Sequence, residues 1–143
     1  MARSRIPAAL TLVTLAGALS ACTGLMAGPA TSSASVIPAG RDSTWVRARR
    51  AMAADFFTLD MADSVAGVIS GVRHPKPGVL AMDPYACRLH VTYLIAEGAD
   101  STPVRVKQQW AAPAKKDGAP TVDCGPEMAD VVSRMEGVLQ IGR

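Results

Sequence analysis

Two stretches of alternating residues constrain the fold of this chain more than any other feature. From residue 87 to 95 and from 104 to 110, every second residue is mainly apolar, and the residues between them are polar except for Leu94. A period of two is typical of a half-buried strand, and the turn-forming residues 97–101 join the two stretches. We therefore expect an antiparallel hairpin with one buried face. Its other face remains in solvent and carries Arg88, His90, Arg105 and Lys107.

Helical spacing flanks this hairpin on both sides. Apolar residues from Trp45 to Phe56 predict a helix over 43–55 with Asp42 or Ser43 as its cap, and the stripe from Met128 to Leu139 predicts a final helix that Gly125 caps. Between them, residues 57–61 and 67–71 predict a second hairpin. The expected fold class is α+β, with a helix, a four-stranded antiparallel sheet and a C-terminal helix, both helices packed on one face of the sheet.

The N-terminus has the pattern of a secretory signal. Arg3 and Arg5 precede an apolar run from Ile6 to Leu19. This run is shorter than the roughly 20 residues of a membrane-spanning helix, so a permanent transmembrane anchor is disfavoured.

The end of this segment, Leu19-Ser20-Ala21-Cys22, resembles the lipobox of bacterial lipoproteins. The resemblance implies a signal peptide over 1–21, cleavage before Cys22, and lipid attached to that cysteine. Thr23, rather than aspartate, follows the cysteine, which by the same resemblance favours an outer-membrane location facing the periplasm. The alternative is ordinary secretory cleavage after Ala21 or Ala27, which leaves Cys22 as a free thiol or removes it.

The predicted mature chain has two parts. Residues 22–41 are mostly small and turn-forming, which predicts a flexible tether after the lipidated cysteine, with a reach of roughly 25 Å. Residues 42–143 form one small domain. Loss of Arg3 and Arg5 leaves basic and acidic groups nearly balanced, which argues against a nucleic-acid partner.

Three cysteines are present, and lipid attachment to Cys22 leaves Cys87 and Cys124 as a pair. In an oxidising compartment a disulfide is the natural expectation. Metal binding is the competing interpretation, but neither cysteine belongs to a C-x-x-C pair and the chain has two histidines. We expect no metal and no cofactor.

No familiar catalytic motif occurs in the chain. It lacks H-E-x-x-H, G-x-S-x-G, a phosphate loop and a dinucleotide fingerprint. His90, beside Arg88 and Thr92, is a candidate acid or base, or else a solvated histidine on the open sheet face. The basic residues 47, 49 and 50 either contact phosphate or lipid headgroups or form a solvated helix face.

The irregular segment from Arg73 to Tyr85 is the best candidate for recognition. Prolines and a glycine interrupt it, and long ordered loops are often functional. We assign candidate partner-binding roles to Arg73, His74, Lys76 and Tyr85. The alternative is a simple connection between two hairpins.

Residues 45–71 resemble a known module. Trp45-Val46, Phe56-Phe57-Thr58-Leu59, Asp63 and Gly67-Val68-Ile69-Ser70 are similar to the tryptophan-led helix, aromatic strand, aspartate turn and returning strand of the lipoprotein C subunit of the outer-membrane β-barrel assembly machinery. The matching positions are mostly core and turn residues. The resemblance therefore implies a fold rather than an activity.

These features together predict a non-enzymatic envelope lipoprotein. It is expected to hold a protein-binding or assembly-supporting domain at the membrane through its N-terminal lipid. The first alternative is an inhibitor or immunity lipoprotein that acts against an envelope hydrolase. The second is a small enzyme built around His90.

Overall fold

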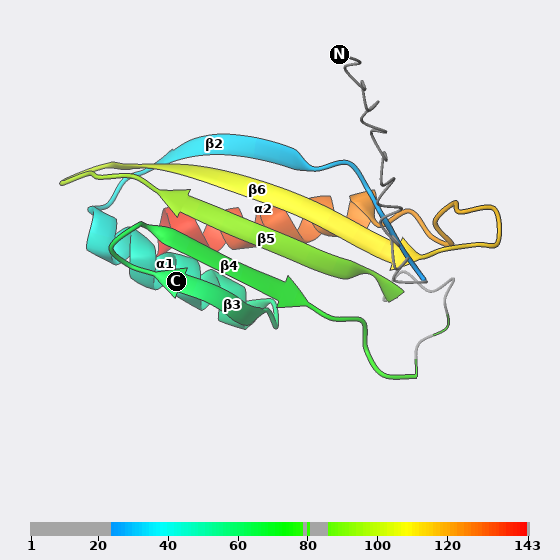
Figure 1. Ribbon diagram of the computed structural model, residues 1–143. Coiled ribbons are helices and arrows are strands. Elements are labelled where there is room, and N and C mark those ends of the chain that lie inside the picture. The colour runs from blue at the N-terminus through cyan, green and yellow to red at the C-terminus, as the bar shows by residue number, and fades with distance from the viewer. Residues whose placement is uncertain (1–23, 79, 81–85, 143) are drawn as a thin grey trace, which may run out of the picture.

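The computed structural model describes residues 24–78, 80 and 86–142. In this part of the chain, six strands form one antiparallel sheet, and two helices lie behind it in the view of Figure 1. The elements in chain order are β1 (Leu25–Ala27), β2 (Thr31–Ile37), α1 (Arg41–Ala54), β3 (Thr58–Asp63), β4 (Val68–Arg73), β5 (Arg88–Ile95), β6 (Thr102–Pro113) and α2 (Gly125–Ile141). The lipobox, Cys22 and Tyr85 lie outside the described residues.

Both predicted hairpins are present. Strand β3 pairs with β4 and β5 pairs with β6, and β4 and β5 join the hairpins into one sheet of order β1-β6-β5-β4-β3. The α+β class and the antiparallel sheet are confirmed, but the expected count of four strands is wrong. The two additional strands, β1 and β2, both pair with β6 and form the far edge of the sheet.

These additional strands come from the segment that the sequence predicts as a tether. Thr31 to Ile37 pairs with Thr102 to Gln108 over seven consecutive residues, so most of this segment is not a free linker. The small side chains of this segment let its backbone approach β6 closely. A Cβ added at Gly28 would lie 2.1 Å from the Trp110 ring, so only glycine lets the backbone reach the hydrogen bond from its amide to Trp110 O.

Helix α1 begins two residues earlier than the sequence predicts. Gly40 is its N-cap and makes no side-chain cap bond, whereas the Arg41 amide donates to Gly98 O at 2.9 Å. The expected caps at Asp42 and Ser43 are therefore wrong. Phe56 was expected on the buried stripe, but the helix ends at Ala54 and Phe57 enters the core instead.

Helix α2 is close to the prediction, and its apolar stripe is buried against the core. Its N-cap is Cys124 rather than Gly125. Two arginines of α1 bind the other end of α2: Arg47 donates to Leu139 O at 2.9 Å and Arg50 donates to Gly142 O at 3.1 Å. These arginines thus satisfy carbonyls that a helix C-terminus leaves without partners, instead of forming a simple solvated face.

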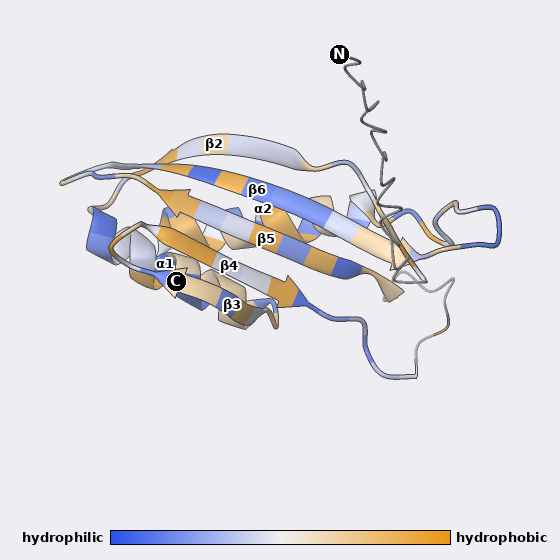
Figure 2. Cartoon of the chain, viewed as in Figure 1, coloured by the Kyte–Doolittle hydropathy of each residue, from blue (hydrophilic) through white to orange (hydrophobic). Residues whose placement is uncertain are grey.

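The core lies between the sheet and the helices. Every second residue of β5 is buried from Leu89 to Ile95, and the same alternation in β6 is visible as changing hydropathy along the ribbon (Figure 2). The predicted buried and open faces of the β5–β6 hairpin are thus confirmed. Neither described helix combines the length and hydrophobicity needed to cross a bilayer.

The predicted disulfide is present in the structure. Cys87 precedes β5 and Cys124 precedes α2, and their sulfur atoms are 2.08 Å apart. The bond joins the start of the final helix to the inner face of the sheet.

Tyr93 is fully buried in the middle of β5, and its hydroxyl has no hydrogen-bond partner among the described residues. Burial, followed by the negative charges of Glu136 and Asp55, raises the pKa of Tyr93. An unpaired buried hydroxyl carries a desolvation cost, so we expect Tyr93→Phe to raise the free energy of unfolding by about 1 kcal/mol at neutral pH. Urea denaturation measures this difference.

The same substitution is expected to change the pH dependence of stability. Above a pH of about 10, Tyr93 ionises in the unfolded chain but stays protonated in the folded one. The unfolded state then binds fewer protons, so stability falls by about 1.4 kcal/mol per pH unit as the pH rises further. In the Tyr93→Phe variant, stability should no longer fall by this additional amount per pH unit. In the matched variant Tyr85→Phe, the fall due to Tyr93 should remain. Parallel curves for the wild type and Tyr93→Phe above pH 10 would contradict the assignment.

Candidate functional site

A pocket of about 240 Å³ opens at the end of the sheet where β4 finishes. Its walls come from the end of α1, the end of β4 and the segment after it, the residue before β5, and α2. The lining residues are Asp55, Phe56, Arg73, His74, Lys76, Cys87, Glu127 and Arg134. We call this the Phe56 pocket.

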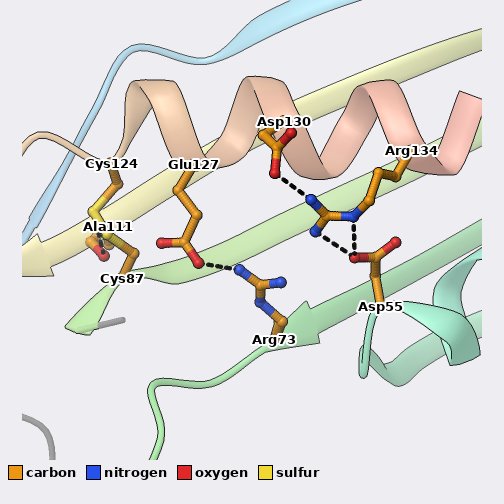
Figure 3. A network of polar contacts seen from close by, with 8 residues as sticks. All are labelled: Asp55, Arg73, Cys87, Ala111, Cys124, Glu127, Asp130 and Arg134. Carbon is orange, nitrogen blue, oxygen red and sulfur yellow. Dashed lines mark hydrogen bonds and ion pairs between the residues drawn. A yellow bond between two sulfur atoms is a disulfide. The ribbon is translucent and has the colours of Figure 1, made fainter. Parts of the chain in front are cut away.

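Two ion-pair systems support the walls of the Phe56 pocket (Figure 3). Arg73 at the end of β4 pairs with Glu127 in the first turn of α2, and both side chains are largely buried. Arg134 of α2 donates to Asp55 Oδ1 through Nη2 at 2.7 Å and through Nε at 3.2 Å, and it also pairs with Asp130. The two systems hold α2 against the ends of β4 and α1.

Burial makes the Asp55 pair the more consequential of the two contacts of Arg134. The Asp55 side chain is 11% exposed, whereas Asp130 is 70% exposed. The hydrogen bond to Asp55 is the main factor that raises the pKa of Arg134. Loss of Arg134 leaves a buried carboxylate without its partner, and such losses are costly. This ion pair is therefore part of the scaffold of the pocket.

Phe56 stands at the mouth of the pocket and is 83% exposed. Its φ angle is +61°, and it is the one described non-glycine residue with positive φ. A positive φ at a bulky residue is sterically unfavourable. An exposed phenylalanine contributes nothing to the core, so the fold keeps an aromatic side chain in a strained conformation on the surface. Such outliers concentrate at functional sites.

The structure brings together three of the four residues predicted to bind a partner. Arg73, His74 and Lys76 all line the Phe56 pocket, whereas Tyr85 lies outside the described residues. Arg73 was predicted to contact a partner, but its side chain forms an ion pair with Glu127 and so connects β4 to α2. His74 and Lys76 are exposed at the rim.

Sequence reasoning missed the acidic residues and Phe56. Asp55 is 79 residues from Arg134, and Glu127 is 54 residues from Arg73, so no local pattern connects the partners. The spacing of Phe56 fits the apolar stripe of α1 and therefore predicts a core position, which is wrong. The adjacent pair Phe56-Phe57 could have indicated that one of the two rings is exposed, because two neighbouring residues at a helix end rarely face the same way.

His90 is part of a separate cluster on the open sheet face. Its Nε2 lies 2.8 Å from Ser70 Oγ and 3.5 Å from Asp60 Oδ2, and Thr92 donates to the same Ser70 oxygen. A serine, a histidine and an aspartate thus meet, but both contacts use one imidazole nitrogen. A nucleophilic triad needs the serine and the orienting carboxylate on opposite nitrogens. The cluster does not have that geometry.

The open face of the sheet also carries a shallow apolar groove of about 470 Å³, at the end where β2 runs beside β6. Val36, Leu94 and Pro103 supply its apolar surface and Arg105 borders it. The three described residues predicted to bind a partner, Arg73, His74 and Lys76, do not belong to this groove. In the described part of the chain, no three metal-binding side chains gather at one point.

Known proteins resemble this chain in fold. No family model matches, and no curated protein matches in sequence. Among solved structures, Ara h 8.0201 is 9% identical with a TM-score of 0.53, over 80% of this chain and 93% of that one.

Two further solved structures have TM-scores below 0.5. An uncharacterised protein from Bacillus thuringiensis is 10% identical with a TM-score of 0.48, over 80% of this chain and 98% of that one. The di-domain ARO/CYC BexL is 15% identical with a TM-score of 0.48, over 79% of this chain and 45% of that one. At 9% identity, the likeness to Ara h 8.0201 shows the fold alone.

Proposed function

We propose that this protein is a lipid-anchored domain of the bacterial cell envelope that binds a protein partner at the Phe56 pocket. The anchor is Cys22, as the lipobox resemblance implies, and the location is the periplasmic face of the outer membrane. The main support for this binding site is Phe56, which is exposed and has a positive φ angle.

The chemistry of the pocket suits a protein surface. Aromatic residues, phenylalanine among them, are enriched in protein interfaces, where a polar rim surrounds an apolar centre. The pocket around Phe56 is also lined by two ion pairs, Arg73 with Glu127 and Arg134 with Asp55. The partner therefore offers an apolar side chain to Phe56 at the mouth of the pocket.

Two observations favour binding over catalysis. The His90 cluster uses one nitrogen for both of its contacts. In the Phe56 pocket, Arg73 pairs with Glu127 and Arg134 pairs with Asp55. A general acid or base needs a free proton-transfer position near a bound substrate. The protein thus acts by holding a partner at the membrane.

A site-specific crosslink tests this proposal. A photoreactive phenylalanine in place of Phe56, in the lipidated protein in cells, is expected to give one discrete crosslinked protein. The matched control places the same residue at Val65, which is 89% exposed in the turn at the far end of β3 and β4. The same products from both positions, or none from position 56 in a folded and anchored protein, would overturn the proposal.

Phe56→Gly separates binding from folding. Glycine adopts positive φ without steric cost, so stability should stay unchanged or rise by up to about 1 kcal/mol. Loss of the aromatic anchor should weaken binding of the captured partner about 30-fold, the usual consequence of removing a dominant interface residue. Urea denaturation and a binding titration with that partner measure the two effects.

A further inference from the structure

The first described residues meet the end of β6 and a turn that carries two lysines. Gly24 O accepts a hydrogen bond from the Ala114 amide at 2.8 Å, and Leu25 pairs with Pro113. Lys115 and Lys116 follow Ala114 directly. The strand β1 and this turn therefore share one end of the molecule, as Figure 1 shows.

The turn is ordered by its own backbone. Lys115 donates its amide to Ala119 O at 2.7 Å, and Gly118 donates to Lys115 O at 2.9 Å. Asp117, the acidic residue of the turn, accepts the Ala119 amide at 3.0 Å through Oδ1. Neither lysine forms an ion pair with a described residue, and both are exposed. Two free cations are thus held at a defined place.

The surface beside these lysines is partly apolar. Leu25 is 50% exposed and Met26 is 44% exposed, because β1 is an edge strand of three residues. Exposed apolar side chains next to lysines are typical of surfaces that meet a membrane, where the cations contact phosphate and the apolar groups enter the headgroup boundary.

The length of chain before β1 limits how far this end can lie from the anchor. Thr23 and Gly24 are the two residues between Cys22 and Leu25. Three Cα–Cα steps span at most about 11 Å. The expected tether of about 25 Å is therefore replaced by a short connection, which keeps β1 and the neighbouring turn close to the lipidated cysteine.

We propose that β1 and the 114–119 turn dock on an anionic lipid bilayer, with Lys115 and Lys116 against the phosphate headgroups. This inference rests on the lipid anchor of the proposed function. A lysine close to an anionic surface favours the docked state about fivefold. The two lysines, opposed by the exposed carboxylate of Asp117 in the same turn, therefore favour it between about fivefold and about 25-fold. The lipid on Cys22 makes docking intramolecular, so this modest preference suffices.

Lysine acetylation tests the docked orientation. The predicted mature chain has four lysines, at positions 76, 107, 115 and 116. The lipidated protein is added to preformed phosphatidylcholine vesicles, either pure or with about a third phosphatidylglycerol. With phosphatidylglycerol, Lys115 and Lys116 should react at least about fivefold more slowly, and about 0.5 M salt should abolish the difference. Lys107 lies on the open sheet face and serves as the internal reference.

Two outcomes overturn the proposal. One is equal rates for Lys115 and Lys116 on both kinds of vesicle, and the other is stronger protection of Lys107, which would mean that the sheet face meets the lipid. Lys115→Gln with Lys116→Gln should also abolish the phosphatidylglycerol-dependent protection of turn amides from hydrogen exchange, whereas Lys107→Gln should preserve it.

The mass of the N-terminal peptide separates the two proposals. An acylated Cys22 with unprotected lysines removes the docking alone, whereas an unacylated Cys22 removes the anchor and the docking with it.

Discussion

Replacement of Cys87 and Cys124 by serine is expected to lower the free energy of unfolding by about 3–4 kcal/mol. The disulfide closes a loop with a sequence separation of 37. Cross-linking a loop of this length lowers the conformational entropy of the unfolded chain, which stabilises the folded state by about 3–4 kcal/mol. It also attaches the first turn of α2 to the sheet beside Ala111, whose carbonyl oxygen is 4.0 Å from the Cys124 sulfur (Figure 3). Urea denaturation of the wild type and the double variant, both without reductant, measures the effect.

Reductant provides the control for this result. It should destabilise the wild type to the level of the double variant and leave the double variant itself unchanged. A loss of less than about 1 kcal/mol would mean that the helix is held almost entirely by its buried stripe. It would also mean that the bond adds little to the walls of the Phe56 pocket, which Cys87 lines.

Cys22→Ser is expected to abolish lipid attachment and cleavage before residue 22. Several acyl chains on one residue hold a protein stably at a bilayer, whereas a single chain binds marginally, so the substitution removes the whole anchor. Intact-mass measurement of the mature protein is the direct readout. The wild type should begin at Cys22 and carry the mass of its acyl groups.

The Cys87→Ser and Cys124→Ser double variant is the matched control, because it should keep its lipid and lose only its disulfide. A mature wild-type chain that begins at Gly28 would contradict the anchor. Cleavage there would also remove β1, whose three residues pair with Ala111, Ala112 and Pro113 of β6. The architecture thus gives a physical argument against that alternative.

The strongest sequence predictions rest on local periodicity. The alternation around Tyr93 predicted a half-buried strand and its partner, and the stripe from Met128 to Leu139 predicted the final helix. The disulfide followed from the small number of cysteines. In each case the pattern lies within one short segment or depends on residue type alone, so no long-range information is needed.

Long-range contacts decided the rest. The segment around β2 has no strong periodicity, and its small residues suggested a tether. It becomes a strand because the edge of β6 offers hydrogen-bonding groups that only the assembled sheet presents. The site follows the same rule, since Arg134 finds Asp55 across 79 residues and the end of α1 turns Phe56 outward while Phe57 enters the core. The sequence by itself thus determined the periodic elements and the cysteine pairing, whereas the tertiary structure decided the sheet edge and the pocket, because these depend on contacts between segments far apart in the chain.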